Sequence, residues 1–266
     1  MQFPLSTKVG SISIELLNSA GAIGKLFYQT LWCFFTGKFR FRVLIEQIAR
    51  IGVESQPVVI LTGAFTGAVL EAQSLFQLQI VKMEAMGGAI VAVGMFRELG
   101  PAITGLMLAG RVGSAMAAEI GTMKVTEQID ALRSMNVNPI DYLVKPRVIG
   151  MLVSTPILMI ESVIVGIVAA YIVGIFAFDV NEAYWVHFMT QFVTLSDIAV
   201  SIIKAFIFGL IIALISCSCG LQTENGAVGV GKSTMRAMVY ASVILLIVNF
   251  IMTMILNTLF PMGFMQ

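Results

Sequence analysis

The sequence has little charge and few of the side chains that bind metals or act as nucleophiles. Only 12% of its 266 residues are charged, against about 25% in ordinary soluble domains. Because 58% of the residues are hydrophobic, a soluble fold of this length would have too much apolar surface to hide from water. A net charge of +1 gives no general attraction to nucleic acid, so no nucleic-acid partner is expected.

Histidine and cysteine are too scarce and too scattered to suggest a reactive centre. The one histidine, His187, cannot build a His-rich metal site. Cys217 and Cys219 are separated by a single residue, and Cys33 stands alone, so no metal-site or disulfide pattern is visible. We expect no metal, no catalytic residue and no cofactor bound by this chain, and therefore no enzyme.

Long apolar runs dominate what remains. A membrane-spanning helix needs about 20 apolar residues, and five runs reach that length. The second and third exceed it, which predicts tilting, kinking or extension beyond the bilayer. The sequence therefore predicts an all-α integral membrane protein whose single domain covers residues 1–266. The five predicted spans are residues 57–78, 87–118, 148–178, 198–219 and 237–260.

Residues 11–50 mix apolar and basic positions and predict one or two amphipathic helices in the membrane interface. The alternative is a short first span over residues 11–36. Asn18, Gly21, Gly24 and Lys25 near its centre weaken that alternative.

Lysine and arginine are distributed unequally between the connections. Six lie in residues 1–52, four in 119–147 and two in 220–236, whereas the opposite connections contain only Lys82. Because basic residues stay on the cytoplasmic side, we expect a cytoplasmic N-terminus and a C-terminus on the other side.

Small residues recur at every fourth position of the second span, which places them on one helix face where another backbone can approach closely. Helix packing is the main interpretation, and a subunit interface or a moving contact is the functional one. The row consists of Gly105, Ala109, Gly113, Ala117 and Gly121.

Ionisable residues inside the apolar runs are candidates for function, because they are costly in a membrane unless paired or wetted. Arg97 and Glu98 precede Pro101, which can free backbone groups for polar partners. Lys204 and Glu71 are further candidates, as is Glu161. The alternatives are a helix-end pair at the interface for the first two and snorkelling for the others.

Residues 122–138 form the most polar connection. Thr126 is expected to cap a short helix with apolar residues at Ile129, Leu132 and Met135, which Asn138 and Pro139 end. Such a helix can dock into a groove on a soluble partner. The alternative is a helix that merely rests on the membrane.

Residues 226–233 satisfy the P-loop pattern G-x-x-x-x-G-K-[ST]. The nucleotide-binding mechanism needs a preceding strand and a Mg²⁺-binding acid, and the surrounding sequence supplies neither. We expect a Gly-rich cytoplasmic turn, with Lys232 and Arg236 anchoring it at the interface.

Several of these motifs together resemble the MlaE family, the permeases of Mla and Mce-type ABC transporters. The similarity covers about residues 45–260. It rests on residues 97–101 (Arg-Glu-Leu-Gly-Pro), 109–115 (Ala-Gly-Arg-Val-Gly-Ser-Ala), 118–123 (Ala-Glu-Ile-Gly-Thr-Met), 126–132 (Thr-Glu-Gln-Ile-Asp-Ala-Leu) and 226–234 (Gly-Ala-Val-Gly-Val-Gly-Lys-Ser-Thr).

The resemblance implies a homodimer in the bacterial inner membrane, driven by cytoplasmic ATPase subunits that bind the ATP and Mg²⁺. It further implies phospholipid exchange with a periplasmic ring of MCE-domain proteins, a process linked to outer-membrane lipid asymmetry. Some relatives carry an acid where Asn249 stands. The implied lipid-binding or gating residues are Arg97, Glu98, Lys204 and Glu71, and those of an ATPase-coupling helix are Thr126, Glu127, Gln128, Asp130 and Arg133.

Two other classes remain as alternatives. An intramembrane enzyme would need a catalytic constellation within the spans, and an ion-coupled secondary carrier commonly shows inverted repeats. Neither pattern is visible in the sequence.

Overall fold

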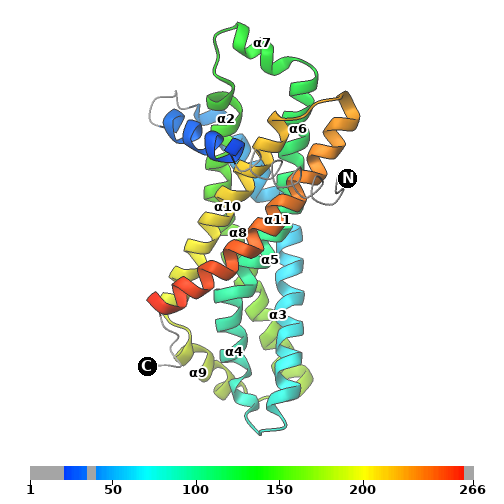
Figure 1. Ribbon diagram of the computed structural model, residues 1–266. Coiled ribbons are helices and arrows are strands. Elements are labelled where there is room, and N and C mark those ends of the chain that lie inside the picture. The colour runs from blue at the N-terminus through cyan, green and yellow to red at the C-terminus, as the bar shows by residue number, and fades with distance from the viewer. Residues whose placement is uncertain (1–20, 35–39, 261–266) are drawn as a thin grey trace, which may run out of the picture.

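The computed structural model describes residues 21–34 and 40–260, and every element within those ranges is helical, as predicted. Five helical runs are long and apolar enough to cross a membrane, which matches the five predicted spans. Figure 1 shows the long helices packed side by side, with α7 at one end of the molecule and α9 at the other.

The first run extends further toward the N-terminus than its predicted span. Helix α3 (Gln56–Leu78) matches the prediction closely, but α2 (Phe41–Gly52) and a 3₁₀ turn, η1 (Val53–Ser55), lead into it without a break. Helix α2 falls in the region predicted to be interfacial. The sequence did not indicate this continuity, because the basic residues of α2 lower its hydropathy.

The second run is not a uniform α-helix. It is α-helical in three stretches that two π-helical turns separate, and each π turn accommodates an extra residue within the helix. After η2 (Glu84–Met86), the run consists of α4 (Gly87–Gly94), η3 (Met95–Leu99), α5 (Gly100–Leu108), η4 (Ala109–Gly113) and α6 (Ser114–Val125).

The remaining spans begin earlier than predicted, and the last does so by eleven residues. The P-loop-like residues 226–233 do not form a turn, which corrects the prediction: they are the first turns of α11. The chain changes direction where α11 begins, at Asn225 and Gly226, which have positive φ. The remaining elements are η5 (Ile140–Val144), α8 (Lys145–Phe178), α9 (Glu182–Phe192), α10 (Leu195–Leu221) and α11 (Gly226–Leu259).

Residues 21–34 form a helix that lies across the long helices near the α7 end (Figure 1). Leu26 and Cys33 are buried, whereas Tyr28 and Trp32 are more than 60% exposed. An exposed aromatic face is typical of a helix in the membrane interface. The rest of the predicted region, residues 11–20 and 35–39, lies outside the described residues.

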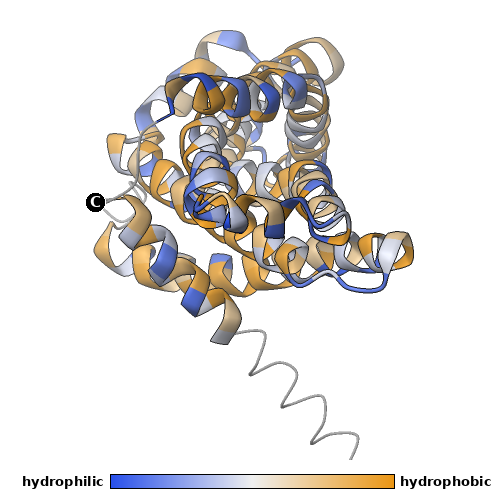
Figure 2. Cartoon of the chain, turned by 90° about the horizontal axis from the view of Figure 1, so that it is seen from above, coloured by the Kyte–Doolittle hydropathy of each residue, from blue (hydrophilic) through white to orange (hydrophobic). Residues whose placement is uncertain are grey.

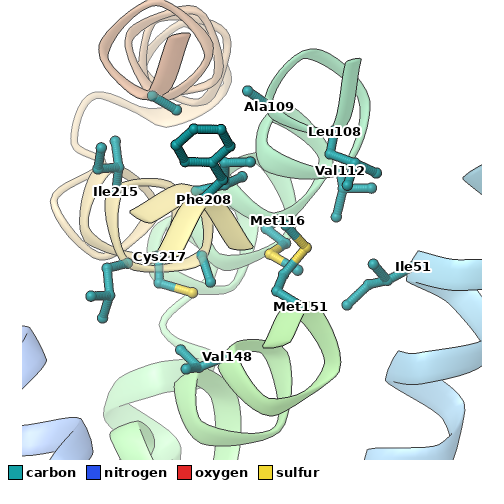
Figure 3. Close-up of a cluster of buried hydrophobic side chains, with 14 of the residues drawn as sticks. Ile51, Leu108, Ala109, Val112, Met116, Val148, Met151, Phe208, Ile215 and Cys217 are labelled. Carbon is teal, nitrogen blue, oxygen red and sulfur yellow. The ribbon is translucent and has the colours of Figure 1, made fainter. Parts of the chain in front are cut away.

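The helices form one bundle, in which hydrophobic residues predominate along the long helices (Figure 2). The larger cluster of buried hydrophobic residues lies in the half of the bundle nearer α7, where it joins several of the long helices. Figure 3 shows Met116 of α6 and Met151 of α8 pointing toward one another within it, close to Cys217 of α10.

Helices α3 and α8 approach each other through small residues. A Cβ atom at Gly63 would lie 2.6 Å from the carbonyl oxygen of Ser162, and one at Gly67 would overlap the carbonyl group of Gly166. Such contact between backbones is the packing expected of small residues in membrane helices.

The small-residue row of the second run is buried within this chain. Gly105 faces Phe208 and Leu245, and Gly121 faces Thr223 and Ser233. All five members of the row are buried. The row therefore packs the second run against α10 and α11 of the same chain, and it does not offer a free surface for another subunit.

Candidate functional site: a buried polar cluster and the α7 segment

The first π turn brings Arg97 into the interior. Its side chain is 2% exposed and pairs through Nε with the buried carboxylate of Asp197 on α10. Its Nη1 donates a hydrogen bond of 2.8 Å to Oδ1 of Asn257 on α11. Arg97 thus ties the second run to both of the last two spans, and the alternative of a helix-end residue at the interface does not apply to it.

Lys204 on α10 lies next to Arg97 and Glu98 and is fully buried. Its Nζ donates to the backbone oxygen of Arg97 (2.6 Å), to Oε1 of Glu98 (2.9 Å) and to Oγ1 of Thr253 (2.9 Å). These three bonds use all the donors of an ammonium group. Lys204 does not snorkel to an interface.

Pro101 explains why a backbone oxygen is available to Lys204. Proline has no N–H, so the carbonyl four residues earlier, that of Arg97, lacks its usual helical partner. The Lys204 ammonium takes that place. The prediction that Pro101 frees a backbone group for a polar partner is confirmed.

Asp197 is the central member that sequence reasoning missed. Its Oδ2 accepts hydrogen bonds of 2.8 Å from both the backbone N–H and the hydroxyl of Thr194, a capping box at the start of α10. Its Oδ1 meets Arg97. The available signal was the Thr-x-x-Asp spacing of residues 194–197, which is typical of a helix start.

Glu98 is the member of the cluster that remains accessible, with a side chain 38% exposed. Besides Lys204, its carboxylate oxygens contact Thr253 Oγ1 (2.8 and 3.0 Å) and accept a bond from Asn249 Nδ2 (3.2 Å). The amide of Asn249 thus serves as a donor where some relatives are expected to carry an acid.

Glu71 does not join this cluster. It is buried on α3 and accepts a hydrogen bond of 2.8 Å from the indole Nε1 of Trp185 on α9. Its other oxygen has no hydrogen-bond partner among the described residues, and the same is true of Oε2 of Glu161 on α8. Glu71 therefore fastens α9 to the bundle, away from Arg97 and Lys204.

The polar connection contains a short helix, α7 (Gln128–Ser134). The prediction that Thr126 caps it is wrong: its hydroxyl donates to the oxygen of Thr122 at 2.9 Å, so it belongs to the end of α6. Glu127 is the residue before α7 and has a left-handed backbone (φ 59°). The helix also ends earlier than Asn138, at Ser134, because Asn136 has positive φ.

Helix α7 exposes its polar residues. Ile129 is buried and Leu132 packs against the core, whereas the predicted apolar position Met135 is 64% exposed. Asp130 pairs with Arg133 at 2.9 Å and with Lys124 at 3.4 Å. The predicted coupling residues all lie on this exposed segment: Thr126, Glu127, Gln128, Asp130 and Arg133.

An apolar groove runs between α3 and α5. Two adjoining hollows of about 400 and 450 Å³ share Phe65 and Thr66, and Leu99, Ile103 and Met107 form the opposite wall. Because Leu99 follows Glu98 directly, the groove and the polar cluster share one turn of helix.

Within residues 21–34 and 40–260, no group of three or more His, Cys, Asp or Glu side chains is placed to hold a metal ion. The P-loop-like residues begin α11, where from the second turn onward the backbone N–H groups bond within the helix.

Comparison with known proteins identifies close relatives. Residues 44–255 match the family described as Permease MlaE. A probable ABC transporter permease protein of Rickettsia conorii is 38% identical over 95% of this chain and 98% of its own length. One from Synechocystis is 38% identical over 82% of both chains. The chloroplastic protein TRIGALACTOSYLDIACYLGLYCEROL 1 of Arabidopsis thaliana is 36% identical over 82% of this chain and 62% of its own length.

Proposed function

The chain belongs to the MlaE permease family and is the membrane permease subunit of an ABC transporter; from this premise we propose that it moves phospholipid and acts as a homodimer. A permease of this kind works with separate ATPase subunits, which bind the ATP and Mg²⁺. The second proposed partner is a periplasmic MCE-domain protein that exchanges lipid with the permease.

The observation that carries the lipid proposal is a polar cluster on the same helical run as an apolar groove, which Glu98 and the neighbouring Leu99 link. The partly exposed carboxylate of Glu98 and the ammonium of Lys204 lie 2.9 Å apart, and the groove beside Leu99 is almost entirely apolar. This combination suits an amphiphile with a polar headgroup and acyl chains. Arg97 and Lys204 hold the site together, and Glu98 is the residue that a headgroup would meet.

The relatives support the same class of cargo. The Arabidopsis relative is named after trigalactosyldiacylglycerol, a glycolipid. Glycolipids and phospholipids differ in their headgroups but both carry acyl chains, so an apolar groove of this kind could bind the acyl chains of both.

The proposed orientation follows from charge. The α7 end carries the connections rich in Lys and Arg, and the connection next to η2 carries only Lys82. With basic connections on the cytoplasmic side, the N-terminus and α7 face the cytoplasm and α9 faces the periplasm of a bacterial inner membrane. The α9 end is then the end that meets the MCE-domain partner.

Helix α7 is the proposed contact with the ATPase. Its exposed residues can fit a groove on a soluble partner, and it follows α6 after only two residues. Because α6 packs against α10 and α11, a displacement of α7 would reach the helices that hold Glu98. ATP-driven closure would thus shift the population between states of different lipid affinity.

The test is purification of the full-length chain in mild detergent, followed by lipid mass analysis and identification of co-purifying subunits. We expect bound phospholipid and an ATPase subunit. The lipid proposal fails if the preparation contains the ATPase but no phospholipid. Absence of both would overturn the proposed function, that is, ATP-driven transport of phospholipid.

A charge reversal tests the coupling role of α7. Glu127→Lys should lower ATP-dependent lipid transfer in proteoliposomes while the chain still inserts and binds lipid. Glu46→Lys, an exposed position on α2 outside the sites described, is the matched control and should transfer normally. Normal transfer by Glu127→Lys would show that α7 is not the coupling element.

A further inference from the structure

A second pocket lies at the α7 end, where α2 and η1 pass α6. Its volume is about 100 Å³. Four charged residues line it: Arg50 and Glu54 from the first run, and Arg111 and Glu119 from the second. The pocket is separate from the polar cluster around Arg97, because no residue of that cluster lines it.

The charges around this pocket do not cancel. Glu119 pairs with Arg50 through one carboxylate oxygen and with Arg147 through the other, at 2.9 Å. Arg111 contacts Glu54 at 3.2 Å. Three guanidinium groups therefore share two carboxylates, which leaves one positive charge uncompensated.

The uncompensated charge is available at the pocket mouth. Arg147 is buried behind Glu119 with a side chain 7% exposed, whereas that of Arg50 is 52% exposed and that of Arg111 is 36% exposed. Arg111 also donates to Oγ of Ser55 at 2.6 Å. Each guanidinium has five N–H donors, so both exposed arginines keep donors for an anion.

The floor of the pocket is apolar. Ile51 of α2, Val112 of η4 and Met116 of α6 line it, and all three belong to the buried core. Figure 3 shows Ile51 pointing toward Val112 and Met116. A ligand seated here would meet cations at its polar end and hydrocarbon immediately below.

We propose that this pocket binds the phosphodiester headgroup of a phospholipid, with Arg50 and Arg111 as its cationic contacts. Arginine suits this ligand because its planar donors match phosphate oxygens. The inference rests on the proposed function, since it takes phospholipid as the cargo. It adds a second lipid position at the α7 end, separate from the Glu98 site, where a lipid of the adjacent leaflet would first be held.

The test uses the full-length chain in mild detergent and a phosphatidylglycerol with a photoactivatable group in its headgroup. Peptide mapping should find cross-links in residues 47–54 and 111–119. Unlabelled phosphatidylglycerol should compete with these cross-links, and diacylglycerol, which lacks the phosphate, should not.

Substitution of the two arginines should remove the site. We expect the Arg50→Gln/Arg111→Gln double variant to cross-link at these peptides about tenfold less, because charge-assisted hydrogen bonds to the phosphate are lost. Arg42→Gln, an exposed position on α2 outside the pocket, should cross-link as the unsubstituted chain does.

The outcomes separate the two proposals. Cross-links near residues 98 and 249 without any in 47–54 and 111–119 would overturn the second site and leave the lipid-transport proposal standing. Equal competition by diacylglycerol, or cross-links that join two copies of the chain at this pocket, would also overturn it. Absence of phospholipid cross-links anywhere would remove the proposed function itself.

Discussion

Arg97 and Lys204 are cations buried in a membrane protein, and the contacts around them decide what they can do. An arginine at the centre of a membrane helix costs about 2.5–3.5 kcal/mol on insertion scales. The Asp197 carboxylate and the Asn257 amide offset that cost for Arg97, and three acceptors do so for Lys204. Both cations therefore join helices of the bundle, and within this cluster Glu98 is the member whose side chain is partly exposed.

The Arg97–Asp197 pair leads to a prediction about stability. Arg97→Gln should lower the thermal midpoint in detergent, because it leaves a buried carboxylate without its charge partner, a change that typically costs about 3–5 kcal/mol in soluble proteins. The Arg97→Gln/Asp197→Asn double variant should recover part of the loss, because no unpaired charge remains. If the double variant loses as much as the sum of the single changes, the two side chains are not coupled.

Sequence reasoning found Arg97, Glu98 and Lys204 because ionisable residues are conspicuous inside apolar runs. It grouped Glu71 with them for the same reason, although the partner of Glu71 is Trp185 on a distant segment. It missed Asp197, which precedes the fourth span among other polar residues. The local sequence shows that a charged residue is costly within an apolar run, but only the fold shows which residue pairs with it.

At the scale of helices, the sequence predicted existence and number well and starting points less well. The apolar runs located all five spans. The start of α11 was missed because glycine has low helix propensity and Lys232 and Arg236 lower the local hydropathy. The helix forms there because Gly229, Ser233 and Ala237 are buried by packing. Tertiary contacts thus override local propensity at this end.

The contact between α3 and α8 leads to a prediction with a built-in control. Gly67→Ala should lower the thermal midpoint in detergent, because its Cβ would overlap the backbone of Gly166, and overpacking typically costs about 1–3 kcal/mol. Gly110→Ala should leave the midpoint unchanged or raise it, because its Cβ would meet nothing closer than Met238 Cε at 3.7 Å and alanine favours helix. Equal midpoints for the two variants would show that α3 and α8 are not packed this closely.

At the scale of the whole molecule, the two ends differ chemically. One end carries α7 and most of the basic connections, and the other carries the exposed Tyr184 and His187 of α9. A membrane protein with such ends has one favoured orientation. This asymmetry is the physical basis for placing the ATPase contact and the periplasmic contact at opposite ends.

Cysteine labelling in cells whose inner membrane is intact tests that orientation. With the outer membrane permeabilised, a membrane-impermeant maleimide should label His187→Cys and should not label Arg133→Cys until the inner membrane is opened. Background should be low at neutral pH: burial, and then the nearby Asp141 carboxylate, raises the pKa of the Cys33 thiol, so little reactive thiolate is present. Labelling of Arg133→Cys alone in closed cells would reverse the proposed topology.

The π turn at Ala109–Gly113 has a consequence for the direction in which the second run leaves the bundle. In a pure α-helix, residues four apart drift around the axis by about 40° per step, so a row of five small residues would wander off one face. A π turn rotates the chain less per residue, which opposes that drift. Gly105 and Gly121 consequently both face the last two spans. The π turn thus contributes to the angular position at which the chain leaves α6 toward α7.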